Sequence, residues 1–369
     1  MRQITIAIHT FPYALRLKHT LEEAGIEVAL QNVNLEHPIV SPGVRVRIHE
    51  HDLAKALRII EVPGSLIMDD DAMFNPVAQV LVPTDLSENS VKACRMALSI
   101  AAAHDTGVYL FHSFITPSLL SPPPLSDELD FDRTEQLAAD ELTDRNEEAA
   151  MHRFGERINN EIAQGKMPSA LIEMKVTEGI PEEAIAMTAK EIGPLLIVMG
   201  TRAAEKKERE VIGSVTAEVL DTVRYPVLSL PENSELETPD DVKRIVYFAT
   251  PDQQDIVAID TMSRLMPLNK DTEVTIVNMP SRRFPTADTS ALESLLTYCT
   301  DHYPMLDFSL VELPADDFAE SLRKLVERQP ADLFCIPNRR RGILSRIFNP
   351  TLAHRMLFKA DMPILSIPV

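Results

Sequence analysis

Residues 194–200, PLLIVMG, are an apolar run that ends in glycine, and residues 213–231, GSVTAEVLDTVRYPVLSLP, contain a helical pattern and a second apolar run. Short apolar runs bounded by turn residues are typical of strands buried on both faces. A helical pattern between two such runs indicates parallel strands joined by a crossover helix. This stretch therefore predicts a parallel sheet covered by helices on both faces.

Upstream of this stretch, strands and helices alternate in the same way back to Pro76. Further strands are expected at AQVLVPT (78–84), GVYLFHSF (107–114) and LIEMKVTEG (171–179), and helices at 87–104, around 133–164 and at PEEAIAMTAKEI (181–192). This order of elements predicts a doubly wound α/β domain that spans residues 76–232.

The downstream part of the chain repeats the pattern. YPVLSLP begins at Tyr225 and MPILSIP at Met362, and the same spacing separates LLIVMGTR (195–202) from DLFCIPNR (332–339). We also align VLVPT (80–84) with VYFAT (246–250). The chain is therefore expected to contain two copies of one α/β unit, the second spanning 241–369. The polar linker PENSELETPDD (231–241) separates them.

The first 68 residues predict a smaller unit of a different kind. Strands are expected at 4–10, 26–32 and 43–49, and helices at 13–25 and 50–60, which gives the order βαββα. Gly25 stands where a left-handed residue ends the first helix. An acidic linker, SLIMDDDAMFNP (65–76), follows. The predicted fold class is thus α/β, with two tandem doubly wound parallel-sheet domains preceded by a small α+β domain.

Composition disfavours several classes of partner. The chain has 369 residues and a formal net charge of −20, which repels nucleic acid and anionic membrane surfaces. Its three cysteines, Cys94, Cys299 and Cys335, are far apart and odd in number, as expected in a reducing compartment. The first residues lack the apolar core of a signal peptide, and no later run approaches about 20 apolar residues. We therefore expect a cytoplasmic protein.

In an open parallel sheet, ligands bind outside the carboxyl ends of the strands, where the strand order reverses. Pro83, Thr84 and Asp85 follow the first strand of the 76–232 unit, and Asp85 could accept a hydrogen bond from an exocyclic amine or a ribose hydroxyl. Gly213 and Ser214 directly precede a helix. The free N–H groups and positive dipole of that helix terminus suit a phosphate chain.

The run from Leu196 to Leu230, together with VLVPTDLSENS at 80–90, resembles the universal stress protein family. Nucleotide-binding members carry the motif G-x2-G-x9-G-S/T, which here reads Gly200, Ala203, Gly213 and Ser214. The resemblance implies an adenine nucleotide α-hydrolase-like fold and a bacterial stress-response protein that binds ATP or another adenine nucleotide, with Mg²⁺ near the phosphates. The site residues that it implies are Pro83, Thr84, Asp85, Ser113, Met199, Gly200, Ala203, Gly213, Ser214, Val215 and Thr216.

Two alternatives to a regulatory protein that only binds nucleotide remain open. Ala203 replaces the second glycine of the motif, and a Cβ there costs roughly 1 kcal/mol or more if the backbone has positive φ. Gly200 and Gly213 could then be only turn and cap residues of an interaction scaffold that has lost its ligand. Enzyme motifs such as GxSxG, GxxxxGK[ST] and HExxH are absent from the sequence, so we expect no enzyme, with slow ATP hydrolysis the other alternative.

The second repeat is expected to be degenerate. Pro337, Arg340 and Pro350 align with the three motif positions, Pro251 is placed opposite Asp85, and proline has no N–H to offer a phosphate. The arginines at 339–341 form a charge run that is more often a solvated surface than a binding site.

The apolar last strands of the two repeats should not stay exposed at a sheet edge. Universal stress proteins commonly dimerise through this strand. The resemblance therefore implies that Val227–Leu230 pairs with Ile364–Ile367 inside one chain, as an intramolecular pseudo-dimer, with a further homo-oligomer possible.

The N-terminal segment 2–61 resembles, more weakly, a P-II-like domain of ferredoxin-like fold, through FPYALRLKHTLEEAGIEVALQN and GVRVRIHEHDLAKALRII. This resemblance implies a regulatory or assembly module. His49 and His51 share a strand face, but two histidines without a third ligand are usually polar surface rather than a metal site.

Overall fold

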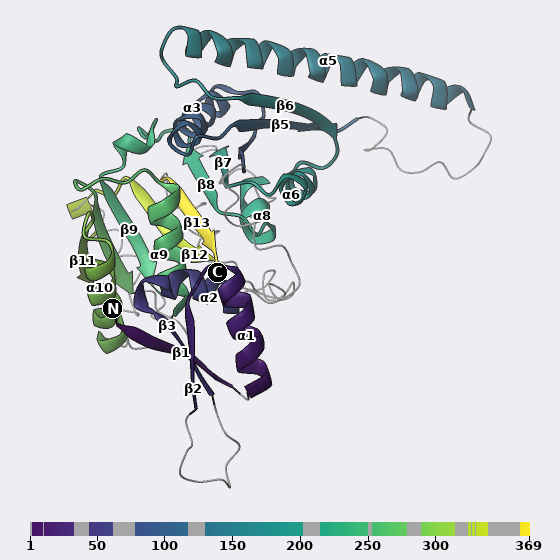
Figure 1. Cartoon of the computed structure of the whole chain (residues 1–369). Helices are drawn as coiled ribbons and strands as arrows, with labels where there is room; N and C mark the ends of the chain where they lie inside the picture. The colour runs from purple at the N-terminus through teal and green to yellow at the C-terminus, as the bar shows by residue number, and fades with distance from the viewer. Residues whose placement is uncertain are drawn as a thin grey trace.

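A ten-stranded sheet forms the centre of the computed structural model (Figure 1). The strand order is β11-β10-β9-β12-β13-β8-β7-β4-β5-β6. The structure describes residues 2–9, 11–32, 44–61, 78–116, 130–201, 215–249, 253–278, 289–313, 324–325, 327–328, 330–338 and 362–369.

The first half of the sheet follows the elements predicted for residues 76–232. It consists of β4 (Val80–Pro83), α3 (Glu88–Ala103), β5 (Val108–Phe114), α5 (Asp130–Ala163), β6 (Ile172–Glu178), α6 (Pro181–Ile192), β7 (Leu196–Thr201), α8 (Val215–Thr222) and β8 (Val227–Pro231). Ser87 caps α3 by accepting a hydrogen bond from the Ser90 N–H, which explains where that helix begins. Each element predicted here from the sequence is confirmed.

The second half contains β9 (Arg244–Ala249), α9 (Gln253–Leu265), β10 (Glu273–Asn278), α10 (Thr289–His302), β11 (Asp307–Val311), β12 (Leu333–Asn338) and β13 (Ile364–Pro368). Its strands follow the order β13-β12-β9-β10-β11, which corresponds element by element to β8-β7-β4-β5-β6 in the first half. The two halves therefore have the same sheet topology.

The strand register corrects one sequence alignment. Val80 pairs with Leu196 in the first half, and Ile245 pairs with Leu333 in the second. Leu196 and Leu333 correspond, so VLVPT aligns with IVYFA at 245–249, and the predicted alignment with VYFAT was wrong by one residue. The error arose because strands that are buried on both faces lack the polar alternation that fixes a register. Thr250, rather than Pro251, is then the sequence position opposite Asp85.

Two apolar cores lie on the two faces of the sheet. Helices α3, α5, α9 and α10 cover one face, where Val82, Leu110 and Tyr247 are buried. Helices α6 and α8 cover the other face, where Leu81 and Phe111 are buried. Each core continues across both halves, so the sheet folds as one layered unit.

The two halves meet at an antiparallel strand pair, β8 with β13. Leu228 lies opposite Leu365, and neither residue is exposed to solvent. The other described neighbours in this sheet are parallel. This confirms the predicted pairing of the two terminal strands within one chain.

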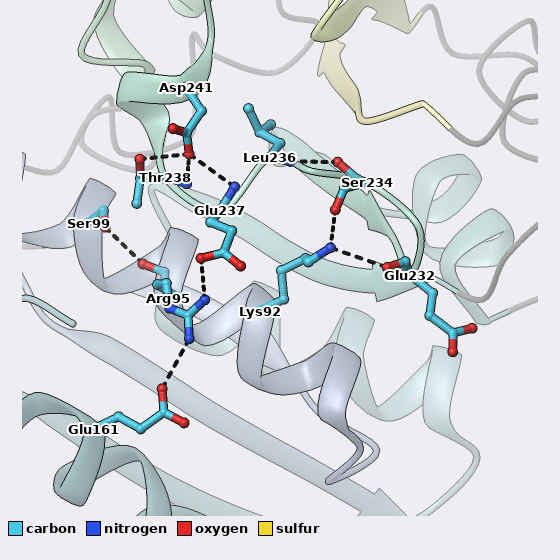
Figure 2. Close-up of polar contacts among 10 residues, drawn as sticks. All are labelled: Lys92, Arg95, Ser99, Glu161, Glu232, Ser234, Leu236, Glu237, Thr238 and Asp241. Atoms are coloured by element: carbon cyan, nitrogen blue, oxygen red, sulfur yellow. Dashed lines mark hydrogen bonds and ion pairs between the residues drawn. The ribbon is translucent and has the colours of Figure 1, made fainter. Parts of the chain in front are cut away.

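The linker between the halves is fastened to α3 (Figure 2). Lys92 Nζ donates to the carbonyl oxygens of Glu232 and Ser234, the former at 3.2 Å. Burial lowers the pKa of Lys92, although the nearby Glu237 and Glu232 carboxylates oppose the shift. The ammonium group therefore satisfies backbone oxygens that a free linker would leave to water.

Arg95 makes a second attachment one helical turn further along α3. Its guanidinium donates to Glu237 in the linker at 2.6 Å and to Glu161 of α5 at 3.1 Å (Figure 2). Thr238 and Asp241 then close a capping box in the 3₁₀ turn η3 (Pro239–Asp241). The linker thus reaches β9 along a fixed path.

The N-terminal unit has a three-stranded antiparallel sheet of order β1-β3-β2. Its elements are β1 (Gln3–His9), α1 (Phe11–Glu23), β2 (Val28–Asn32), β3 (Val44–His49), the 3₁₀ turn η1 (Glu50–Asp52) and α2 (Leu53–Glu61). The predicted βαββα order is confirmed, and Gly25 has the expected positive φ of 76°. The ferredoxin-like assignment stays a prediction.

Helix α2 packs against α9 and so places this unit on the second half of the sheet. Arg58 of α2 forms an ion pair with Asp260 of α9 and donates to Thr261 at 3.2 Å. Tyr303 donates to the same Asp260 carboxylate at 3.2 Å. A shared, largely buried carboxylate therefore holds the two units together.

We predict that a chain truncated after Pro231 self-associates. Removal of β13 uncovers β8, whose five residues are buried in the full chain, and its unpaired N–H and C=O groups would seek another strand. Size-exclusion chromatography with light scattering should show a mass that rises with concentration, compared with the full chain at the same concentrations. A mass equal to that of the monomer at every concentration would contradict the prediction.

Candidate functional site

The carboxyl ends of β4 and β7 form the point where the strand order reverses. β4 continues into β5 on one side, whereas β7 leads to β8 on the other. The ladder between β4 and β7 has only two paired positions, Val80 with Leu196 and Leu81 with Ile197, whereas β7 and β8 pair at five. The strand ends therefore separate at this point, where doubly wound sheets bind their ligands.

The loop after β4 is held in a fixed conformation by its own side chains. Asp85 Oδ1 accepts hydrogen bonds from Ser90 Oγ at 2.7 Å and from the Ser87 N–H at 3.1 Å. Thr84 Oγ1 accepts from the N–H of Leu86, which has a positive φ of 63°. A positive φ in a branched residue is strained, so these bonds hold a conformation that the chain would otherwise avoid.

These hydrogen bonds favour the ionised form of Asp85. Partial burial raises its pKa, but the bonds from Ser87 and Ser90 outweigh that effect, so the pKa lies below the ordinary value of 3.8. Asp85 is exposed. The loop therefore presents a carboxylate to solvent at the end of β4.

Gly200 has a packing reason to lack a side chain. A Cβ built there would lie 2.7 Å from Asn89 Nδ2. Asn89, in the first turn of α3, donates to the Thr201 carbonyl at 2.8 Å. The amide thus ties α3 to the end of β7, and sequence reasoning missed it because asparagine in a first turn carries no motif.

Three of the predicted site residues share one face of the sheet at this edge. Side chains alternate along a strand, so Pro83 faces the same side as Leu81, and Ser113 the same side as Phe111. Met199 is buried in that same core, under α6 and α8. The structure therefore brings these three residues to one end and one face of the sheet.

The first turn of α8 lies on this face as well. Thr216 is buried and Val215 packs on the same core. Thr201 Oγ1 is buried without a hydrogen-bond partner among the described residues. Buried hydroxyls rarely lack a partner, so the Thr201 hydroxyl is an exception among the described side chains at this edge of the sheet. The predicted residues Ala203, Gly213 and Ser214 lie outside the described residues.

His112 is a second residue that sequence reasoning missed. It lies one position before Ser113 on β5, is 8% exposed and contacts the Thr84 carbonyl through Nδ1 at 2.8 Å. Its Nε2 lies 3.2 Å from Glu147 Oε2 of α5. A lone histidine within an apolar strand gives no signal of this network, because Glu147 is distant in sequence.

The corresponding region of the second half is built differently. Asp255 is fully buried, and Tyr247 donates to its Oδ1 at 2.8 Å. Burial, and then the Asp255 carboxylate, raise the pKa of Tyr247 well above its ordinary value. Pro337 lies within β12, while Arg340 and Pro350 are outside the described residues. The carboxylate of this half is therefore part of the core.

Within the described ranges, no group of three or more His, Cys, Asp or Glu residues is placed to hold a metal ion. The rings of His49 and His51 stack at 5.6 Å.

Among the residues that the structure describes, no helix is both long enough and apolar enough to cross a membrane.

These features define a doubly wound α/β protein with its candidate site at the ends of β4 and β7. Residues 77–231 match the model of the universal stress protein family. Universal stress protein MJ0531 of Methanocaldococcus jannaschii is 28% identical over 166 residues, which cover 45% of this chain and 86% of that protein.

The chain is also similar to solved structures. A universal stress protein of Archaeoglobus fulgidus aligns with a TM-score of 0.50 and 16% identity over 79% of this chain and 98% of its own. A functionally unknown protein of Pseudomonas aeruginosa aligns with a TM-score of 0.46 and 14% identity, covering 81% of this chain and 94% of that one. The first likeness supports the mostly parallel α/β sheet.

We predict that Gly200→Ala lowers the free energy of unfolding by about 1–3 kcal/mol, because the new Cβ displaces Asn89. In an Asn89→Ala background the same substitution should cost at least about 0.5 kcal/mol less, since the clashing amide is gone. Urea unfolding of the four proteins measures this coupling. Equal costs in both backgrounds would show that Asn89 is not the reason for the glycine.

We further predict that Asp85→Asn destabilises the protein at neutral pH but not in acid. The lowered pKa means that Asp85 contributes stability above about pH 3.8, which is lost as the pH falls through the folded-state pKa. Asparagine keeps an acceptor oxygen without the charge, so the loss should be about 1 kcal/mol at this exposed position. Urea unfolding at pH 7, 5 and 3 tests the trend, and an unchanged difference at pH 3 would contradict it.

Proposed function

We propose that the protein is an adenine-nucleotide-binding regulatory protein of the stress response, with one site in its first half. The match of residues 77–231 to the universal stress protein family supports the class of function. The observation that carries the site is that the ordered Asp85 loop follows β4, and Met199 and Gly200 lie in β7, beyond the two positions at which these strands pair. ATP is the proposed ligand, with Mg²⁺ near its phosphates.

The proposed site assigns different tasks to its two ends. Asp85, held ionised by Ser87 and Ser90, accepts from the ribose or the exocyclic amine, while Pro83, Ser113 and Met199 form the wall against the base. The stretch 213–216 at the start of α8 supplies N–H groups and hydroxyls to the phosphates. None of these residues is proposed as a nucleophile, and we propose no enzymatic activity.

We also propose that residues 241–369 are a second, degenerate unit of the same family. Its strand order matches the first half, and its carboxylate, Asp255, is buried with Tyr247 rather than presented to solvent. Prolines stand in this half at motif positions that need an N–H. This unit therefore serves as the partner of the first half and binds no nucleotide. We propose a cytoplasmic location for the whole chain.

The alternative function is an interaction scaffold without nucleotide. One observation favours it: Asn89 already accounts for the absence of a side chain at Gly200, so that glycine does not by itself require a phosphate. Denaturing freshly purified protein and testing for released adenine nucleotide separates the two functions.

We predict that ATP titrates one site per chain by calorimetry. Gly213→Asp, which places a carboxylate at the phosphate end, and Asp85→Ala should each abolish the heat of binding. Arg340→Ala is the matched control in the second half and should leave binding unchanged. A stoichiometry near two that falls to one in Arg340→Ala, or no binding to the wild-type protein, would overturn the proposal.

A further inference from the structure

His112 connects the Asp85 loop to helix α5. His112 is 8% exposed, and its side chain lies between the Thr84 carbonyl, which follows β4, and the Glu147 carboxylate of α5. Thr84 directly precedes Asp85. A change at this imidazole therefore reaches the loop that bears the candidate ligand.

Both contacts of the imidazole are acceptors. A carbonyl oxygen only accepts hydrogen bonds, so Nδ1 must donate to Thr84. An ionised Glu147 also only accepts, so Nε2 must donate as well. Both bonds exist together only when the His112–Glu147 pair holds one proton beyond neutral imidazole and carboxylate, most simply as imidazolium facing carboxylate.

The stretch of α5 around Glu147 is less buried than the stretch further along the helix. Met151, Phe154 and Ile158 are buried in the core against the sheet. Before them, residues 139–150 are exposed or half-buried, and Leu142 is 60% exposed. The bond from Glu147 to His112 therefore contributes to holding a stretch that buries little apolar surface.

The second half shows the same position without a titratable group. Val108 and Val274 hold equivalent places beside the first strands, so His112 corresponds to Asn278. Asn278 donates to the Leu313 carbonyl at 3.0 Å and accepts from the Leu313 N–H. Asparagine makes a fixed connection there, which does not depend on pH.

We propose that His112 is a positioning residue that makes the first-half site sensitive to pH, an inference that rests on the proposed nucleotide function. Histidine changes charge between about pH 5 and 8. In its protonated form His112 joins Glu147 to Thr84 and holds the Asp85 loop in place. As the pH rises and the extra proton leaves, one of the two bonds is lost, α5 loosens between 139 and 150, and the nucleotide binds more weakly.

Other charged groups lie on the elements that neighbour β5. Asp85 follows β4, Glu178 ends β6, and the ion pair of Glu88 with Arg157 joins α3 to α5. Asp85 accepts hydrogen bonds from Ser90 and from the Ser87 N–H, and Glu178 accepts one from Thr116. Glu147 is the carboxylate within hydrogen-bond distance of His112.

Calorimetry of full-length protein with ATP at pH 6, 7 and 8 tests the proposal, using wild type, His112→Asn and Glu147→Gln. The ionisation of ATP changes equally for all proteins, so the ratio of variant to wild-type Kd isolates the histidine. We expect His112→Asn to bind roughly three- to tenfold more weakly at pH 6 and equally at pH 8. Glu147→Gln should follow the same trend. His152→Asn, an exposed histidine on α5, should stay at a ratio of one.

Hydrogen exchange without nucleotide provides an independent readout. Protection factors of peptides from 139–150 should fall between pH 6 and 8 in wild type but not in His112→Asn. If the wild-type protein binds no ATP, the proposed function fails. The hydrogen-exchange comparison then tests by itself whether His112 holds α5 in a pH-dependent way. Identical protection profiles in the two proteins at both pH values, or a Kd ratio independent of pH, would overturn the role of His112.

Discussion

The antiparallel pairing of β8 with β13 is the interaction on which the rest of the sheet depends. Each strand would otherwise be the apolar edge of a five-stranded sheet, with unpaired backbone groups beside buried leucines. Because β8 and β13 pair, these two edge strands become the central strands of one sheet, and the apolar core on each face continues across both halves. The fixed linker on α3 is a consequence, because β9 has to begin where the shared sheet requires it.

Helix α3 links this architecture to the candidate site. Its first turn carries Ser90, which orders Asp85, and Asn89, which crosses to β7. Further along, Lys92 and Arg95 hold the linker to the second half. One helix therefore contacts both the site loop and the junction between the halves.

The sequence predicted the elements well because most were long and strongly patterned. Buried runs such as LLIVMG have local causes, and they form strands in the structure at the expected places. The register of β9 could not be read in the same way, since residues buried on both faces lack alternation. Asn89 and His112 were missed for another reason: their partners, Thr201 and Glu147, are brought close only by the fold.

The two halves differ in whether the carboxylate near the first strand is exposed or buried. Counted along the aligned strands and helices, Ser90 corresponds to Asp255, and Val82 to Tyr247. In the first half the buried Ser90 hydroxyl donates to the exposed Asp85 carboxylate. In the second half the Asp255 carboxylate is itself buried and accepts a hydrogen bond from the Tyr247 hydroxyl. A buried acid paired in this way stabilises a core but offers nothing to a ligand. One scaffold can thus expose a carboxylate at its edge in one half and bury a carboxylate in its core in the other.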